Sequence, residues 1–264
     1  MERRTARRAL ARAATVSVVA TAGMVLLSGT GQPVTAQPHS SWQAIAVPPL
    51  SPRTAALGVR VGHRVLVLGG RDAAGSALGD GAAYDVQTGR WRHLRAPVGL
   101  TRSDRAAAAA GVLVVRRATQ GKASWWAFDP TGWIWNRLRG VPAGARAPTA
   151  FGSEVYAVAG RHVVVFSVAI DRWTALPADP LRPALHHRRV TPGRQGTAVT
   201  GHAGGARVTD TWDGTRWRRT AAALPGAQTR ALLPAGVDRR TATSVQLGGR
   251  LLVVARGHAW IHSP

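Results

Sequence analysis

The sequence contains no cysteine among its 264 residues. The fold therefore cannot rely on disulfides, and no thiolate is present to bind a metal. The same absence excludes a lipid-modified cysteine as a membrane anchor. Because 45% of the residues are hydrophobic, we expect a folded chain held together by packing of apolar side chains.

Acidic residues are also scarce, with 12 Asp and Glu against 35 Lys and Arg. Glu154 is the only glutamate beyond Glu2. A glycosidase requires two carboxyl groups that converge on one sugar, and the sequence indicates no such pair. We therefore expect a non-enzymatic protein without a cofactor. The alternative is a divergent extracellular carbohydrate-active enzyme, such as a hydrolase, lyase or oxidase.

Histidines offer one further route to a metal site. His186 and His187 are adjacent, and His202 follows in the next predicted strand. Adjacent histidine side chains generally point apart, and a solvated, arginine-rich loop disfavours a bound cation. We expect no metal at these residues.

The first 36 residues resemble an export signal. Five arginines precede an apolar stretch of fifteen residues, 13–27, and the small residues Val34-Thr35-Ala36 precede a predicted cut before Gln37. The apolar stretch is short for a membrane span, so we expect secretion, with retention as an uncleaved anchor as the alternative. The export route stays open, because Arg7-Arg8 is only a weak twin-arginine signal. The expected location is extracellular, with association to the cell wall as a further possibility.

A phrase recurs along the rest of the chain: a short apolar strand, an aromatic residue and then a tryptophan. The most complete copy spans Arg64 to Leu94, and fainter copies begin at Gly111, Glu154 and Gly196. The aligned landmarks are Tyr84, Phe128, Phe166 and Trp212, followed by Trp91, Trp135, Trp173 and Trp217. Units of about four strands with no helical period are typical of propeller blades. A β-sandwich is the alternative, but the fixed offset between the two landmarks favours the propeller.

The most complete copy resembles a kelch repeat. In that family a diglycine closes the second strand, as Gly69-Gly70 does here, and a tryptophan such as Trp91 lies in the fourth. The resemblance is specific only near residues 54–138, and it implies a propeller like that of galactose oxidase more firmly than it implies a function. Some kelch-like propellers carry a copper site that includes a cysteine-modified tyrosine. This chain has no cysteine, so that site is not carried over and the resemblance implies a non-catalytic propeller.

The ends of the chain complete the count of blades. Residues 250–260 supply a second and a third strand but no fourth-strand tryptophan, whereas residues 41–45 form a free strand with Trp42 equivalent to Trp91. Pairing this strand beside Trp260 removes exposed sheet edges. The predicted fold is an all-β, five-bladed β-propeller of four-stranded antiparallel blades over residues 37–264, with the N-terminal strand closing the last blade.

The net charge is strongly positive. It is +23 for the whole chain, and removal of the leader's five arginines and one glutamate leaves +19. We expect attraction to polyanions, such as an anionic polysaccharide, a cell-wall polymer or an acidic protein, with strong dependence on salt. Export makes nucleic acid an unlikely partner. Contact with a membrane is expected only through an uncleaved leader or through surface charge.

One placement of arginine goes beyond composition. An arginine stands just before the presumed first strand of every blade, and first strands line the centre of a propeller, so we expect a ring of guanidinium groups at one mouth of the channel. The ring consists of Arg53, Arg105, Arg146, Arg189 and Arg240. Trp125 and Trp133 lie outside the repeated landmark, which makes them the candidates for stacking on a sugar ring. A composition rich in arginine is the alternative explanation of the ring.

Overall fold

The computed structural model describes one of two compact units of the chain. The units are residues 1–39 and 40–264, and every described residue belongs to the second. The described residues are 42–97, 99–119, 122–220, 233–234, 236–238 and 241–263. The predicted export signal lies outside them. They contain no helix that is long and apolar enough to cross a membrane.

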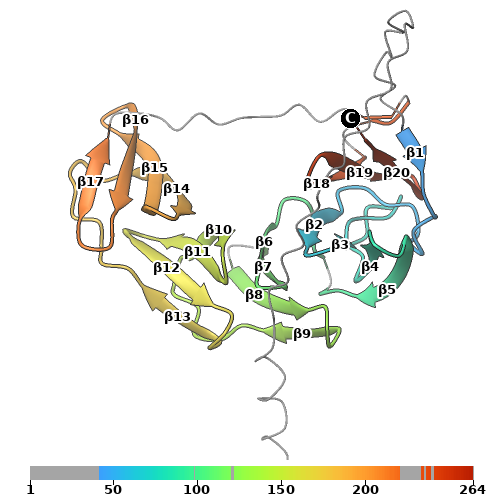
Figure 1. Cartoon of the computed structure of the whole chain (residues 1–264), viewed down its shortest axis with the longest axis horizontal. Coiled ribbons are helices and arrows are strands. Elements are labelled where there is room, and N and C mark those ends of the chain that lie inside the picture. Colours follow the sequence, from blue (N-terminus) through green and yellow to red (C-terminus); the bar gives the residue numbers. More distant parts are fainter. Residues whose placement is uncertain are drawn as a thin grey trace, which may run out of the picture. The chain divides into compact units, whose positions relative to one another are not determined.

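The described residues form twenty strands in five four-stranded antiparallel sheets, which are the blades of a propeller (Figure 1). The first blade contains β2 (Leu57–Val61), β3 (Arg64–Leu68), β4 (Asp80–Asp85) and β5 (Arg90–Arg95). The second contains β6 (Arg105–Ala109), β7 (Val112–Thr119), β8 (Lys122–Asp129) and β9 (Ile134–Arg137). The third contains β10 (Arg146–Phe151), β11 (Glu154–Ala159), β12 (His162–Ser167) and β13 (Arg172–Ala175). The fourth contains β14 (His186–Gly193), β15 (Gly196–Ala203), β16 (Ala206–Trp212) and β17 (Trp217–Thr220). The fifth contains β18 (Thr243–Leu247), β19 (Arg250–Ala255), β20 (His258–His262) and β1 (Trp42–Ala44).

The fifth blade is built from both ends of the described chain. The strand β1 pairs antiparallel with β20, with Trp42 opposite His262 and Ala44 opposite Trp260. In Figure 1 the blue β1 lies at the edge of the dark red β18–β20. The prediction that the N-terminal strand completes the last blade is confirmed. Pairing with β1 covers a ladder edge that β20 would otherwise expose.

The two aromatic landmarks of the repeat are cross-strand partners. Each residue of the first set lies opposite one tryptophan of the second, and the ring centroids are 4.9–5.7 Å apart. These pairs are Tyr84 with Trp91, Phe128 with Trp135, Phe166 with Trp173, and Trp212 with Trp217. Directly opposite residues of antiparallel strands pack against each other, which explains the constant offset in the sequence. The fifth blade uses Trp42 and His262 in the same way, at 4.9 Å.

The fourth-strand tryptophans also join neighbouring blades. The indole Nε1 of Trp91 donates to the Ala46 carbonyl at 2.7 Å, that of Trp135 to Arg95 at 2.8 Å, and that of Trp217 to Pro177 at 3.1 Å. Each acceptor lies four residues beyond the tryptophan of the preceding blade. The predicted role of these tryptophans in packing between blades is therefore confirmed.

The hydrophobic core is divided into layers between blades. Separate clusters of buried residues join the first blade to the second, the second to the third, the third to the fourth and the fifth to the first. Middle strands such as β3 and β12 are buried over almost their whole length because a layer covers each of their faces. Fourth strands such as β13 are largely exposed. The first strands contact one another in the order β18, β2, β6, β10 and β14, which makes them the inner edges of the blades.

Candidate functional site

A depression of about 840 Å³ lies over the first strands of three successive blades. It is lined by Arg105 at the start of β6, by residues 146–149 of β10 and by residues 186–191 of β14. We call it the arginine depression, because Arg105, Arg146, Arg188 and Arg189 contribute to it. None of the described residues that line it is Asp or Glu. A hollow of this size accommodates a drug-sized ligand or several units of a polymer.

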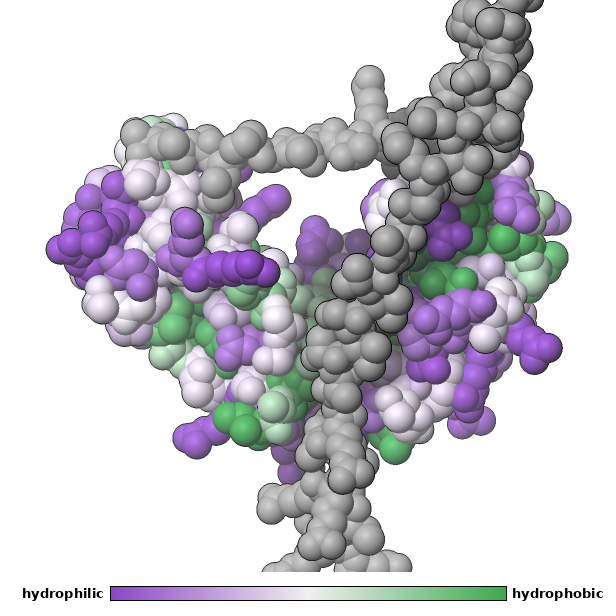
Figure 2. Space-filling model, viewed as in Figure 1, coloured by the Kyte–Doolittle hydropathy of each residue, from purple (hydrophilic) through white to green (hydrophobic). Residues whose placement is uncertain are grey.

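Three of the five arginines of the predicted ring thus share one hollow. Arg105, Arg146 and Arg189 are exposed, and none forms an ion pair with a carboxylate of the described residues. Arg105 donates only to backbone carbonyls, those of Ser103 at 2.8 Å and Asp104 at 3.3 Å. Guanidinium groups without a carboxylate partner retain their donors for an external anion. Figure 2 shows hydrophilic residues, in purple, gathered over the β14–β17 blade at the left of the view.

The backbone at the two strand starts explains how these side chains reach the depression. The register of β10 shifts between Arg146 and Thr149, and that of β14 shifts in the same way between His186 and Arg189. A left-handed residue lies inside each irregularity, Ala147 with φ 53° in β10 and His187 with φ 50° in β14. Bulges re-aim side chains, and left-handed non-glycine residues gather at functional sites.

The strand pairings also correct the alignment of the predicted arginine ring. The first paired residues of the inner strands are Thr54, Arg105, Arg146 and His186. All four are exposed, and we call their place the exposed start position. The residues immediately before them, at the buried start position, are Arg53, Asp104, Ala145 and Leu185. His186 is therefore the structural equivalent of Arg146, and Arg189 corresponds to Thr149, a match that the sequence repeat did not reveal.

Arg53 does not belong to the arginine depression, contrary to its predicted place in the ring. It is 8% exposed, and its two terminal nitrogens donate to the Asp80 carboxylate at 2.8 and 3.0 Å. The Gly69 carbonyl accepts a further bond at 3.0 Å. The hydrogen bond from Arg53 lowers the pKa of Asp80. Arg53 is therefore a structural residue of the first blade, whereas Arg240 lies outside the described residues.

The two tryptophans predicted to stack on a sugar are already engaged. Trp125, in β8, is 3% exposed and packs edge-on against Trp173 at 5.3 Å, so its ring faces are covered. Trp133 is half-buried at the turn before β9, where the guanidinium of Arg92 lies 3.8 Å from its ring centroid. Phe128 meets the same ring edge-on at 5.9 Å. Neither tryptophan lines the arginine depression.

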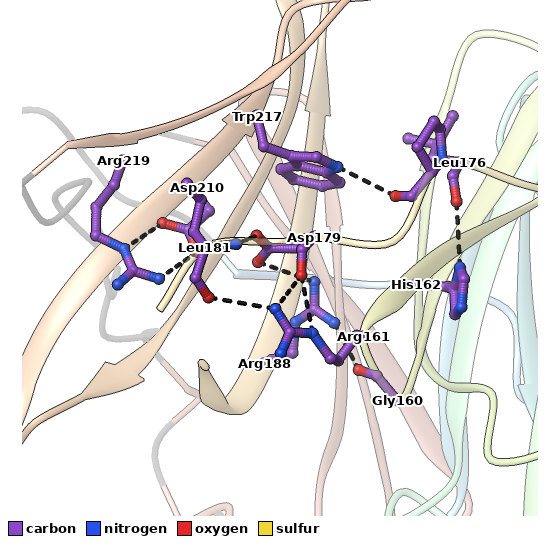
Figure 3. Close-up of polar contacts among 11 residues, drawn as sticks. Gly160, Arg161, His162, Leu176, Asp179, Leu181, Arg188, Asp210, Trp217 and Arg219 are labelled. Carbon is purple, nitrogen blue, oxygen red and sulfur yellow. Dashed lines mark hydrogen bonds and ion pairs between the residues drawn. The ribbon is translucent and has the colours of Figure 1, made fainter. Parts of the chain in front are cut away.

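Arg188, which contributes to the lining of the depression, belongs to a buried ionic cluster (Figure 3). Asp179 and Asp210 are 3% and 0% exposed. Arg219 donates to both carboxylate oxygens of Asp210 at 2.7 Å, and Arg188 lies 3.7 Å from Asp179 and also donates to the Gly160 carbonyl at 2.5 Å. Burial raises the pKa of Asp179, and the hydrogen bond and charge of Asp210 raise it further. Burial likewise lowers the pKa of Arg188.

The cluster fixes Arg188 inward and thereby orients its neighbours. Arg188 is 4% exposed, and its anchors lie in the third blade at Gly160 and in the β13–β14 connection at Asp179. Arg161 donates to the backbone carbonyl of Asp179 through Nε at 2.8 Å, which ties the same connection to the β11–β12 turn. Successive side chains of a strand alternate between faces, so anchoring Arg188 inside directs Arg189 outward. The sequence repeat gave no signal for this carboxylate pair, because its two members come from a loop and a strand 31 positions apart.

The structure brings His202 close to both His186 and His187. His186 is opposite His202 in the β14–β15 ladder, and the rings of His187 and His202 are 6.3 Å apart at nearly right angles. Within the described ranges, no group of three or more His, Asp or Glu is arranged to hold a metal ion. His186 and His187 line the arginine depression, where they add polar edges to its wall.

Comparison with known proteins provides no match from which a function could be inferred, so the inference of function rests on the geometry of the site. No model of a known protein family matches the chain, and no curated protein matches it either.

Proposed function

We propose that this chain is a non-enzymatic binding module that recognises an anionic polymer through the arginine depression. The carrying observation is that Arg105, Arg146 and Arg189, from three blades, line one hollow whose described lining residues include no carboxylate. A planar guanidinium fork is suited to carboxylate, sulfate or phosphate. Export to the cell exterior, and association with the wall there, are parts of the same proposal.

A kelch-type origin of the propeller belongs to the proposal as well. It is supported by the diglycine after β3, where both residues have positive φ, 59° at Gly69 and 95° at Gly70. A Cβ at Gly69 would lie 2.2 Å from the Leu100 carbonyl oxygen, and one at Gly70 would lie 2.7 Å from that of Thr54. Only glycine fits this backbone conformation and this close approach.

The buried acids support binding over hydrolysis. A glycosidase needs two carboxyl groups that reach the sugar, whereas Asp179 and Asp210 are shielded and held by arginines. Neither of them lines the depression. A divergent carbohydrate-active enzyme therefore has less support from these residues than a binding module.

Two matched triple variants test the proposal. Replacing Arg105, Arg146 and Arg189 by Gln should weaken binding of an acidic polysaccharide such as heparin strongly, because it empties the depression of its free guanidinium groups. The control replaces the exposed Arg90, Arg172 and Arg216, all outside the depression, and removes the same net charge. Binding is measured by isothermal titration calorimetry at two salt concentrations. Equal losses in both variants would mean that the attraction is diffuse, which would refute the site.

A further inference from the structure

We propose that the arginine depression is selective for a phosphodiester chain, a polymer with one phosphate in each repeating unit. This inference rests on the proposed function and names the class of its ligand. Its basis is the imbalance between hydrogen-bond donors and acceptors in the lining, together with the repetition of basic residues from blade to blade.

Donors dominate the side chains of the depression. A guanidinium carries five N–H donors and no acceptor, and three exposed arginines, Arg105, Arg146 and Arg189, contribute to the lining. Among the described lining residues, the side-chain acceptors are the hydroxyls of Thr149 and Thr191 and the imidazoles of His186 and His187. A sugar presents many hydroxyl donors, which require acceptors such as Asp, Glu, Asn or Gln, and none of the described lining residues is of these types. A phosphodiester presents charged acceptor oxygens and no donor, which matches this wall.

Aromatic stacking is also missing from the depression. The part of its lining that the structure describes includes no Trp, Tyr or Phe. An aromatic side chain offers a sugar ring a flat apolar face and a polar edge together. The two tryptophans that the sequence predicted to stack on a sugar are already in contact with other side chains, Trp125 with Trp173 and Trp133 with Arg92. Charge and hydrogen bonding are thus the means of recognition that remain, and they favour phosphate over a ring-based uronate.

Basic residues recur at the exposed start position, which is why we expect a polymeric ligand rather than a single anion. Arg105, Arg146 and His186 occupy it in three successive blades, whose inner strands β6, β10 and β14 contact in that order. A basic or protonatable group therefore recurs once per blade along the wall. A ligand whose charges also recur can meet several of these groups at once, and linked contacts gain affinity over separate ones.

The test compares poly(glycerol phosphate), a phosphodiester chain, with an oligogalacturonate that carries the same number of charges. Titration calorimetry on the full chain should give about tenfold or tighter binding of poly(glycerol phosphate), because its charged acceptor oxygens match the donors of the wall. The preference should vanish in the Arg105→Gln, Arg146→Gln, Arg189→Gln variant and persist in the Arg90, Arg172, Arg216 control. Neutral dextran serves as the blank and should not bind.

A lysine variant at the same three positions separates loss of the site from loss of the fold. An ammonium binds phosphate as a point charge, so this variant should keep most of the affinity for poly(glycerol phosphate) and should melt like the parent protein. Loss as complete as in the glutamine variant would overturn the inference. Equal or tighter binding of oligogalacturonate, lost only in the depression variant, would also overturn it while leaving the proposed function intact. Equal losses in the depression and control variants would refute both.

Discussion

The starts of the first and third blades show how one residue of register separates a buried, ion-paired arginine from an exposed one. Arg53 precedes the left-handed Ala55 by two residues, whereas Arg146 precedes the left-handed Ala147 by one. Side chains alternate between the faces of extended backbone, so this offset turns Arg53 inward to Asp80 and Arg146 outward to the depression. The same residue type in the same apparent motif thus serves two purposes.

Availability of a carboxylate completes the difference between the two regions. Asp80 begins β4 and meets the guanidinium of Arg53 with both oxygens. The corresponding strand of the third blade begins with His162, which offers no negative charge. With few acidic residues in the chain, many of the described arginines, among them Arg105, Arg146 and Arg189, form no ion pair with a described carboxylate, and these three converge on one hollow as a candidate site. The distribution of carboxylates, more than that of arginines, distinguishes the regions.

The largest effect on stability is expected from breaking the ion pair between Arg53 and Asp80. Arg53→Gln should lower the free energy of unfolding by about 3 kcal/mol, because it leaves the partly buried Asp80 carboxylate without its partner. Arg146→Gln, at the exposed start of β10, should change it by less than about 0.5 kcal/mol. Urea denaturation followed by tryptophan fluorescence measures both. Similar losses in the two variants would contradict the assignment of separate roles.

A smaller effect should distinguish the tryptophans of the same two blades. Trp91 donates to the Ala46 carbonyl, whereas the buried Nε1 of Trp173 has no hydrogen-bond partner. Trp91→Phe should therefore be more destabilising than Trp173→Phe by about 1 kcal/mol, the net contribution of one hydrogen bond. The two substitutions remove the same atoms, so each controls for the other in chemical denaturation. Equal losses would show that the bond to Ala46 adds nothing to the packing between blades.

The smallest effects should appear in the pH dependence, with opposite signs in the two regions. Asp80 has a lowered pKa in the folded chain, so its contribution to stability is present at neutral pH and lost as the pH falls through that pKa. Asp179, in the buried ionic cluster, has a raised pKa, so its contribution is present at low pH and lost as the pH rises through that pKa.

Two asparagine variants and a control check these signs. As the pH rises from about 2 to 5, the parent protein should gain stability relative to Asp80→Asn, and as it rises from about 4 to 7 the parent should lose stability relative to Asp179→Asn. The control is Asp171→Asn at an exposed turn, where asparagine also tolerates the left-handed backbone. Melting temperatures across both ranges provide the measurement. A shared sign for Asp80 and Asp179 would show that the pKa of Asp179 is not raised in the folded chain.

Much of the fold was predictable because it is repeated and local. The offset between residues such as Tyr84 and Trp91 reflects one cross-strand pair, and a periodic pattern of this kind survives divergence of everything around it. The pairing of Trp42 with the last blade was predictable for the same reason, since a free fourth strand and a missing one must meet. The candidate site was harder to predict. Position in the repeat indicated Arg105, Arg146 and Arg189, which line the depression, but it also indicated Arg53, and Trp125 was a further candidate, although the fold buries both of these.

The sequence by itself determined the strands, the number of blades, the strand that completes the last blade and the excess of positive charge, since these follow from periodicity and composition. The tertiary structure decided which arginines remain open to a ligand. The exposure of each arginine depends on bulges at Ala147 and His187, whose backbone conformation has no sequence signature, and on contacts between residues distant in sequence. Asp80 lies 27 positions from Arg53, and Asp179 and Asp210 meet only when a loop packs behind the fourth blade. Which face of a strand an arginine occupies, and whether a carboxylate distant in sequence lies beside it, are properties of the folded chain. Together they decide which arginines are buried in ion pairs and which are exposed.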